Sequence, residues 1–303
     1  LKQNGYAAYA FHPYEKTFWN RQAMYRNFGF DKFYGKGDFK PAEIVGWDIG
    51  DEYFFTQSVD MLKQARQPFY AFLVALSSHH PYSNIPRSYH TLPLGPYADT
   101  LFGNYLTAVH YVDYAIGTLV DKLKKEGLWD NTVLIFYGDH DGYLNMDKKM
   151  ADFIGVSFDA LTQDQILRQT PLYIHIPGSR ETGESRQTVG MIDIAPSVLQ
   201  LLGIDASQYD MMGRTITDHA DHRIVFRSGG FSDGKLYFVA SPDGDVNKGV
   251  CYNLASRQRV GLPLCRDGAD MAMQELSFSD KIITNDLLRD FRKQEQEQEE
   301  KIP

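Results

Sequence analysis

The order of apolar and amphipathic segments predicts an α/β fold, a sandwich with a largely parallel central sheet between helices. Four short runs are apolar at nearly every position, which is typical of strands covered on both faces. These runs are Tyr6–Phe11, Phe69–Leu76, Val133–Tyr137 and Leu172–Ile176. Helical patterns lie between them, and strands that alternate with helices indicate a parallel sheet. Ligands of such sheets bind beyond the carboxyl ends of the strands.

Two helices are expected from the spacing of apolar residues. In the longer one, apolar side chains recur every three or four residues and form one face of an amphipathic helix. They are Phe102, Leu106, Val109, Val112, Ile116, Leu119 and Leu123. Lysines in its last turn complement the helix dipole, and Gly127 ends it. The second helix is expected from Ile192 to Leu202, closed by Gly203.

The pattern changes near His222, where short strands separated by Gly, Asp and Asn turns predict a small antiparallel sheet. The expected strands are Ile224–Phe226, Lys235–Ala240 and Val250–Leu254, and a polar helix is expected over Asp286 to Glu300. We therefore predict a larger α/β domain, residues 1–221, and a subdomain with an antiparallel sheet and a C-terminal helix, residues 222–303. Cys251 and Cys265 flank a turn-rich stretch, where a disulfide and two buried thiols are both open interpretations.

Composition excludes some classes of function. The formal net charge of the 303 residues is -8, which argues against non-specific binding to nucleic acid, since that needs clustered Lys and Arg. No apolar run reaches the roughly 18 to 20 residues that a membrane helix needs. The sequence begins with Leu and enters a strand almost at once, so we interpret it as a fragment whose N-terminal part, with any membrane anchor, is missing.

The motif with the clearest chemistry follows the third apolar run, in Tyr137–Gly138–Asp139–His140–Asp141–Gly142. A carboxylate and a neutral imidazole are standard ligands of a divalent cation, and neighbouring glycines let a backbone turn sharply and approach a ligand closely. We predict that Asp139 and His140 bind a metal ion in the active site of an enzyme that acts on a phosphate or sulfate ester. The alternative is a polar turn at the end of a strand.

A second polar loop follows the first strand and contains His12 and the segment Lys16–Thr17–Phe18–Trp19–Asn20–Arg21. Arg pairs geometrically with phosphate and sulfate oxygens, and Trp provides a flat wall. The alternative is that Trp19 is a core residue and Arg21 a surface charge. Phe18 and Trp19 are adjacent, so both cannot face one core from a helix, and we expect one of them to be available to a ligand.

A third polar loop, Leu76–Ser77–Ser78–His79–His80–Pro81–Tyr82, also follows a predicted strand. Histidine suits acid–base catalysis near neutral pH. A single His is more often structural, but two other loops of this kind strengthen the functional interpretation.

The chain resembles the phosphoglycerol transferases of the alkaline phosphatase/sulfatase superfamily, the lipoteichoic acid synthase family, over about residues 5 to 292. The resemblance rests on the three loops above and on further segments in the same order. These are Gly29–Phe30–Asp31–Lys32–Phe33–Tyr34, Thr170–Pro171–Leu172 to Gly178, Ile192–Asp193–Ile194–Ala195–Pro196 and Leu201–Leu202–Gly203. It implies a sulfatase-like fold in which residues 1–221 form a catalytic core that lacks its N-terminal part.

The resemblance also implies roles for individual residues. Asp139 and His140 would hold one divalent cation, manganese first, with magnesium and zinc as the other candidates. Trp19 and Arg21 would hold the glycerol phosphate. His79, rather than His80, and His12 would line the site, with His79 as the catalytic histidine.

The implied reaction moves glycerol phosphate from phosphatidylglycerol to a glycolipid or polymer acceptor through a threonine-linked intermediate. The family's threonine and a glutamate ligand lie further upstream than the residues before Trp19 allow, and Thr17 is inside the Lys16–Arg21 segment itself, so it is not the nucleophile. We therefore expect both groups to precede residue 1, and this polypeptide alone to be inactive and to bind metal weakly. The resemblance implies a bacterial membrane protein, anchored by an N-terminal transmembrane region, with this domain outside the cell.

Three alternatives remain at this stage. A sulfatase would carry its modified cysteine in a Cys–Xaa–Pro–Xaa–Arg setting, which neither Cys251 nor Cys265 has. A phosphoethanolamine transferase of the same superfamily is a second alternative. A non-catalytic module that binds wall polymer is a third, of a different class.

Overall fold

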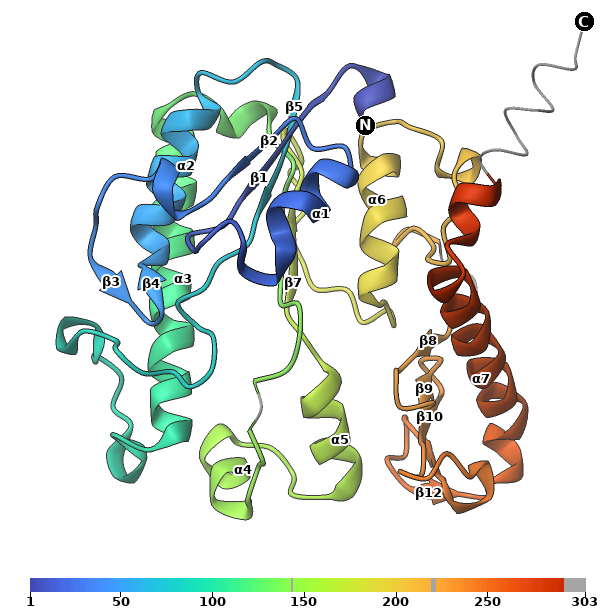
Figure 1. The fold of residues 1–303 in the computed structure, drawn as a ribbon. Coiled ribbons are helices and arrows are strands. Elements are labelled where there is room, and N and C mark those ends of the chain that lie inside the picture. The colour runs from blue at the N-terminus through green and yellow to red at the C-terminus, as the bar shows by residue number, and fades with distance from the viewer. Residues whose placement is uncertain (143, 219–221, 292–303) are drawn as a thin grey trace, which may run out of the picture. The chain divides into compact units, whose positions relative to one another are not determined.

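The computed structural model describes residues 1–142, 144–218 and 222–291, which form two compact units (Figure 1). The first unit comprises residues 1–155 and 169–181, and the second comprises residues 156–168 and 182–303. The predicted division at residues 221 and 222 stays a prediction about domains. Most of the polar helix expected over Asp286 to Glu300 lies outside the described residues.

The first unit contains a parallel sheet, two antiparallel strand pairs and four helices in its described part. The strands are β1 (Ala7–Phe11), β2 (Lys32–Tyr34), β3 (Ile44–Val45), β4 (Asp48–Ile49), β5 (Phe69–Leu73), β6 (Leu134–Tyr137) and β7 (Leu172–His175). The helices are α1 (Arg21–Asn27), α2 (Asp51–Leu62), α3 (Leu101–Lys125) and α4 (Lys148–Ile154).

The parallel sheet has the order β2-β1-β5, which confirms the predicted fold class. Phe11 at the end of β1 is in register with Tyr34 and with Leu73, so all three strands end at one edge. The chain after β1 and the chain after β5 therefore leave the sheet side by side. The pair β6–β7 is antiparallel and is separate from this sheet, although the four apolar runs predicted one largely parallel sheet.

Helices α2 and α3 pack together beside the parallel sheet (Figure 1). Their shared core contains Phe11 from β1, Phe54 from α2 and Leu119 from α3, all buried. The predicted amphipathic helix is confirmed as α3, which Thr100 caps by accepting a hydrogen bond from the Gly103 amide. Val109 was expected on its buried face but is 42% exposed, because the buried stripe is centred on Ala108, Tyr111 and Ala115 instead.

The second unit is built on the predicted antiparallel sheet, which has five short strands in the order β12-β11-β10-β9-β8. These are β8 (Ile224–Val225), β9 (Phe231–Ser232), β10 (Leu236–Val239), β11 (Val250–Asn253) and β12 (Arg259–Val260). Its helices are α5 (Ala160–Arg168), α6 (Ile194–Leu201) and α7 (Pro263–Thr284). Helix α6 corresponds to the helix expected over Ile192 to Leu202.

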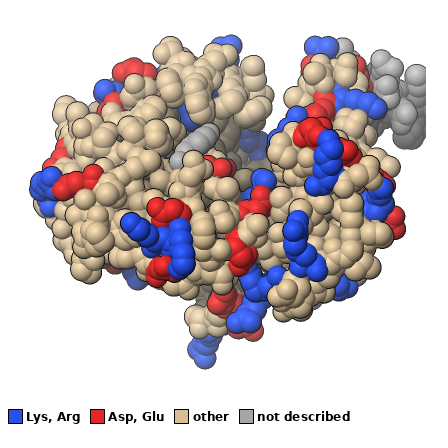
Figure 2. All heavy atoms as spheres, turned by 90° about the horizontal axis from the view of Figure 1, so that it is seen from below, with Lys and Arg blue, Asp and Glu red and all other residues tan. Residues whose placement is uncertain are grey.

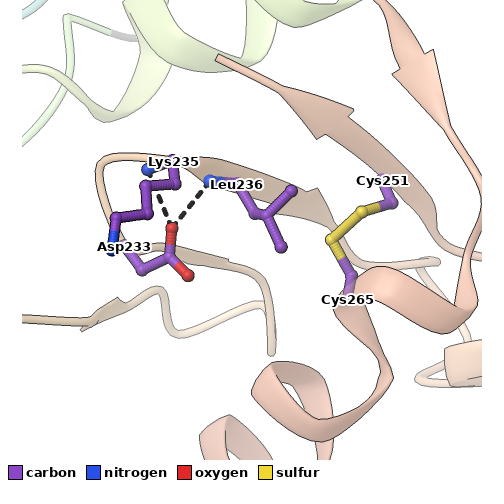
Figure 3. Close-up of a disulfide and its surroundings, with 5 residues drawn as sticks. All are labelled: Asp233, Lys235, Leu236, Cys251 and Cys265. Atoms are coloured by element: carbon purple, nitrogen blue, oxygen red, sulfur yellow. Dashed lines mark hydrogen bonds between the residues drawn. A yellow bond between two sulfur atoms is a disulfide. The ribbon is translucent and has the colours of Figure 1, made fainter. Parts of the chain in front are cut away.

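A disulfide joins Cys251 on β11 to Cys265 on α7, which settles the two interpretations of this cysteine pair (Figure 3). Both cysteines are buried in a cluster with Phe231 and Phe238. The turn from β9 to β10 is closed by Asp233, whose Oδ1 accepts hydrogen bonds from the amides of Lys235 and Leu236 at 2.9 and 2.6 Å (Figure 3).

Charges of both signs are interspersed on the face seen in Figure 2, with Lys and Arg beside Asp and Glu. Ion pairs within one element include Lys148 with Asp152 on α4 and Arg168 with Asp164 on α5. None of the helices in the described ranges combines the length and the apolar character needed to cross a bilayer.

Candidate active site

The predicted site residues lie in loops that follow β1, β5 and β6. His12 comes directly after β1, His79 lies six residues beyond the end of β5, and Asp139 and His140 follow β6. The rings of His79 and His140 are in edge-to-face contact, with centroids 5.8 Å apart. The structure thus brings together two loops that are about sixty residues apart in the sequence.

Asp139 and His140 face each other across a gap of 3.7 Å between Oδ1 and Nε2. Both side chains are accessible, with 72% of Asp139 and 46% of His140 exposed. The Nδ1–H of His140 donates to the backbone carbonyl of Asp141 at 2.7 Å. Since a carbonyl can only accept, Nε2 is the nitrogen with the lone pair in the neutral ring, and it lies on the side of the Asp139 carboxylate.

This donor pair fits a divalent cation as part of its ligand shell. Protein oxygen and nitrogen ligands lie about 2.0–2.2 Å from Zn²⁺, so two ligands of one ion stand roughly 3–4 Å apart. A proton on Nδ1 bonded to a carbonyl is also the usual arrangement of a metal-binding histidine. Within the described ranges, no group of three or more His, Cys, Asp or Glu side chains is arranged to hold a metal. Asp139 and His140 therefore offer two ligands of a larger set.

The glycines beside this pair are explained by close packing rather than by an unusual backbone. A Cβ on Gly138 would lie 3.1 Å from Pro171, and one on Gly142 would lie 3.0 Å from Tyr105. Neither glycine has a positive φ. The glycines were expected to allow a sharp turn. In the structure they instead leave room for neighbouring segments.

His79 is oriented by the same kind of bond as His140. Its Nδ1–H donates to the carbonyl of His80 at 2.8 Å, which leaves Nε2 as the acceptor nitrogen. The indole of Trp47, in the turn between β3 and β4, contacts the His79 ring edge to face at 4.6 Å. A histidine with a defined tautomer and one basic nitrogen in an open site is suited to proton transfer.

His12 is buried and links two of the segments that carry the site. Its Nδ1–H donates to the carbonyl of Val74 at 3.0 Å, which ties the end of β1 to the chain that follows β5. Burial lowers the pKa of His12 to about 4, and the charges of Arg21 and His79 act in the same direction. His12 is therefore neutral near pH 7.

Trp19 lies in a strained turn that leads into α1, and Arg21 is the first residue of that helix. Trp19 and Asn20 both have left-handed backbones, with φ of 52° and 55°, a conformation that costs free energy for residues with side chains and clusters at functional sites. Trp19 is 72% exposed and stacks on Phe18 at 5.4 Å, so it is the aromatic residue available to a ligand. The interpretation of Trp19 as a core residue is therefore wrong.

Arg21 is held in place and retains hydrogen-bonding capacity. Its guanidinium lies over the Trp19 ring, 5.5 Å from the centroid, and Nη1 donates to the Tyr25 hydroxyl at 3.0 Å. Its Nε is buried and has no hydrogen-bond partner among the described residues. A buried donor without an acceptor is costly, and an anionic ligand would remove that cost. Arg21 is thus more than the surface charge of the alternative interpretation.

The loops that carry these residues are fixed by contacts that the sequence did not reveal. The buried carboxylate of Asp51, at the start of α2, accepts hydrogen bonds from the amides of Leu76 and Ser77. The Tyr82 hydroxyl donates to the Gly142 carbonyl, and burial raises the pKa of Tyr82 to about 12, so it stays protonated near pH 7. Asp51 and Tyr82 thereby hold the His79 loop in place and bind it to the loop that carries His140.

Trp47 and Asp51 were not expected at this site, and Tyr82 was expected in the third polar loop but without a role of its own. Trp47 could have been noticed because it follows Gly46 directly, in a turn where a large aromatic residue is unusual. Asp51 gave no signal beyond that of an acidic residue at the start of a helix. The catalytic and binding roles of His12, Trp19, Arg21, His79, Asp139 and His140 stay predictions.

The chain thus combines an α/β fold with an accessible Asp–His pair, an oriented histidine and an arginine at the start of α1, groups that are chemically suited to an anionic ester. Residues 1–204 match the family model described as sulfatase, and the chain belongs to this family. The resemblance to lipoteichoic acid synthases is confirmed by curated relatives. The chain is 32% identical to lipoteichoic acid synthase 2 of Bacillus subtilis and 30% identical to lipoteichoic acid synthase of Staphylococcus saprophyticus.

Each of these alignments covers 95% of this chain and 44% of the relative, so the chain spans a little under half the length of the curated relatives. Among solved structures, the lipoteichoic acid synthase LtaP of Listeria monocytogenes matches with a TM-score of 0.84 and 28% identity. That match covers 94% of this chain and 71% of LtaP. A protein of the alkaline phosphatase superfamily from Vibrio parahaemolyticus matches with a TM-score of 0.72 and 25% identity, over 94% of this chain and 67% of that one.

Proposed function

We propose that this protein is part of a metal-dependent transferase that moves glycerol phosphate from phosphatidylglycerol to a glycolipid or polymer acceptor. The observation that carries the proposal is the contact of His79 with His140, beside Asp139, which joins a proton-transfer group to a cation-binding pair. The relatives named lipoteichoic acid synthases support the choice of glycerol phosphate over other esters.

Different residues of the site bind different parts of this substrate. The Arg21 guanidinium donates to the equatorial oxygens of the phosphate, whose charge grows in the transition state. The exposed face of Trp19 packs against the glycerol carbons. His79 Nε2 exchanges a proton with the hydroxyl that leaves or enters, because its Nδ1 is already committed to the His80 carbonyl.

A divalent cation, manganese or else magnesium or zinc, would be held by Asp139 and His140 and would neutralise charge on the ester oxygens. The transfer proceeds in two displacements. The oxygen of a threonine outside these 303 residues bonds to phosphorus, the bond from phosphorus to the diacylglycerol oxygen breaks, and diacylglycerol leaves with a proton. The oxygen of an acceptor glycerol hydroxyl then bonds to phosphorus and gives up its proton, the bond from phosphorus to the threonine oxygen breaks, and the threonine oxygen takes up a proton.

We place this domain on the outer side of a bacterial cell membrane, where phosphatidylglycerol headgroups and the growing polymer meet. The disulfide between Cys251 and Cys265 supports this location, since disulfides persist in oxidising environments outside the cytoplasm. Attachment to the membrane is proposed to come from a transmembrane region elsewhere in the whole protein.

Binding of glycerol phosphate to the 303-residue chain tests the proposal without requiring turnover. Arg21→Ala should weaken binding about 10-fold or more, because hydrogen bonds to a charged group contribute roughly 1.5–3 kcal/mol. Arg26→Ala, in the same helix α1, is the matched control and should bind like the wild type. Isothermal titration with glycerol phosphate, inorganic sulfate and phosphoethanolamine compares the proposed ligand with those of the rival enzymes. Equal binding by the wild type and Arg21→Ala, or a clear preference for sulfate, would contradict the proposal.

Catalysis gives a second test in the whole enzyme. Arg21→Ala should lose about 2–4 kcal/mol of transition-state stabilisation, as other donors to developing oxyanions do. An unchanged kcat/KM for phosphatidylglycerol would exclude this role for Arg21.

A further inference from the structure

Trp47 stands in the middle of a row of aromatic rings that spans the site. Trp19 stacks on Phe18, and Phe18 meets Trp47 edge to face at 6.4 Å. Trp47 meets His79 at 4.6 Å, and His79 meets His140 at 5.8 Å. Trp47 is therefore the ring that links the anion-binding loop after β1 to the histidine loop after β5.

Trp47 and His79 share one hydrogen-bond acceptor. The carbonyl oxygen of His80 accepts from the indole Nε1–H of Trp47 at 3.1 Å and from His79 Nδ1–H at 2.8 Å. The bond from His79 to the next residue's carbonyl is local and depends on how that carbonyl is oriented. The bond from Trp47 fixes the carbonyl from another element, the turn between β3 and β4, and so stabilises His79 in the tautomer with the proton on Nδ1.

The turn that carries Trp47 is itself anchored to the histidine loop. Gly46 has a φ of +79°, and a Cβ at this position would lie 3.0 Å from the Ser77 carbonyl oxygen, so only glycine fits without displacement. The Gly46 amide donates to the Asn84 carbonyl at 3.2 Å. Val45 and Asp48 on either side are buried. The indole is consequently held by a rigid support while 37% of the residue remains exposed at the site.

We propose that Trp47 is a positioning residue for His79, an inference that rests on the proposed role of His79 in proton transfer. The indole holds the His80 carbonyl, the carbonyl holds the proton on His79 Nδ1, and His79 Nε2 remains the basic nitrogen that faces the reacting hydroxyl. The edge-to-face contact fixes the angle of the imidazole ring. Without Trp47, the imidazole of His79 can still transfer a proton. Its proton is no longer held on Nδ1, and its ring is no longer held at the angle that directs Nε2 toward the reacting hydroxyl.

Nitrogen NMR of the histidine rings in the full 303-residue chain tests this directly. At pH about 8, above the ordinary histidine pKa of about 6.5, the ring nitrogens report which tautomer is present. The His79 signals are assigned by their loss in His79→Gln. The wild type should show the proton on Nδ1, and Trp47→Phe, which keeps a ring but has no N–H, should show a substantial population with the proton on Nε2. Trp129→Phe, a change of the same kind elsewhere in the first unit, should leave the His79 signals unchanged.

A second variant at position 47, with a side chain of the same shape as indole, separates loss of the hydrogen bond from loss of packing. Benzothienylalanine at position 47 keeps the shape of indole and replaces the N–H with sulfur, so it should shift the His79 tautomer as Trp47→Phe does. A wild-type tautomer in both Trp47 variants would overturn the proposal, and a shifted tautomer in both supports it. A shift in Trp47→Phe alone would also overturn it, because loss of packing and not loss of the hydrogen bond would then be the cause.

Turnover of phosphatidylglycerol by the whole enzyme separates this inference from the proposed function. Trp47→Phe should lower kcat about 10²-fold, as small misplacements of catalytic groups do, while KM for the lipid changes little. In the double variant with His79→Gln, Trp47→Phe should cause no additional loss, since both act through one group. If glycerol phosphate neither binds nor turns over, the proposed function fails, but the tautomer measurement still decides whether Trp47 positions His79.

Discussion

At the scale of single residues, His12 links the stability of the protein to pH. Burial lowers its pKa to about 4, from an ordinary value of 6.5. Below pH 6.5 the unfolded chain takes up a proton at this position while the folded protein does not, so stability falls between pH 6.5 and pH 4. A shift of this size corresponds to about 3 kcal/mol.

We therefore expect His12→Gln to remove this component of the pH dependence. Chemical denaturation at several values between pH 7 and pH 4 should show the wild type losing about 3 kcal/mol relative to the variant. Parallel curves for the two proteins over that interval would mean that His12 titrates normally in the folded state.

Asp139 and His140 provide the second prediction at this scale. Two protein ligands leave most of a cation's shell to water, so the 303-residue chain should bind Mn²⁺ weakly and reversibly. Asp139→Asn should reduce that binding by at least about 10-fold, the loss commonly caused by removing even an indirect metal contact. Asp130→Asn, in the turn before β6 rather than after it, is the control. Electron paramagnetic resonance of free Mn²⁺ measures both, and equal binding by Asp139→Asn and the wild type would show that the cation binds elsewhere.

The sequence indicated the candidate catalytic and metal-binding residues better than the residues that hold them in place. Asp139, His140 and His79 could be proposed from the sequence because each follows an apolar run within three residues. Trp47 and Tyr82 act through contacts with residues that lie 33 and 60 positions further along the chain, His80 and Gly142. Local patterns carry no information on such distant partners.

At the scale of elements, the start of α2 acts as an anchor for the histidine loop. Asp51 is buried, and its carboxylate accepts hydrogen bonds from the amides of Leu76 and Ser77, while its own amide donates to the Ser77 hydroxyl. Burial raises the pKa of Asp51 to about 6, even though these hydrogen bonds favour the ionised form. The folded protein thus binds a proton here more readily than the unfolded chain does.

The sign of this effect is opposite to that of His12. As pH falls through 6 toward 3.8, protonation of Asp51 should stabilise the folded state by about 3 kcal/mol relative to an Asp51→Asn variant. Because the effects of Asp51 and His12 partly cancel near pH 5, each must be measured against its own variant. Denaturation of Asp51→Asn and the wild type at pH 7 and pH 4 checks the sign, and a wild type that loses stability relative to the variant on acidification would refute the assignment.

Helices and strands differed in how well the sequence predicted them. The helix α3 was predicted because its apolar residues repeat without interruption for six turns. The helix α7 was missed because its polar residues and Gly268 hide the apolar face, and that glycine is required where a Cβ would meet the Phe231 ring at 2.4 Å. The strands β9 and β12 have two residues each, too few to show alternation.

At the scale of the whole molecule, the fold class could be predicted and part of the strand pairing could not. The apolar runs at β1 and β5 led correctly to a parallel sheet, whereas its third strand, β2, was not among the expected strands. The antiparallel pair of β6 and β7 comes from runs of the same apolar character, although both strands are only partly buried and Tyr173 on β7 is 67% exposed. Direction depends on the connection through α4 and α5, which periodicity does not describe.

The division into two units gives the last prediction, which concerns the disulfide of the second unit. Cys251 and Cys265 are buried and close a loop of about 15 residues, for which cross-linking contributes roughly 3 kcal/mol by restricting the unfolded chain. The double variant Cys251→Ala, Cys265→Ala should therefore destabilise the second unit by about that amount. Hydrogen exchange of β10, β11 and α7 measures this loss.

The same variant shows whether the first unit depends on the second. All three tryptophans, Trp19, Trp47 and Trp129, lie in the first unit, so tryptophan fluorescence reports on that unit alone. We expect the fluorescence midpoint in denaturant to stay close to the wild-type value while the exchange protection of the second unit falls, because each unit has its own hydrophobic core. Equal shifts in both measurements would mean that the two units unfold as one cooperative structure.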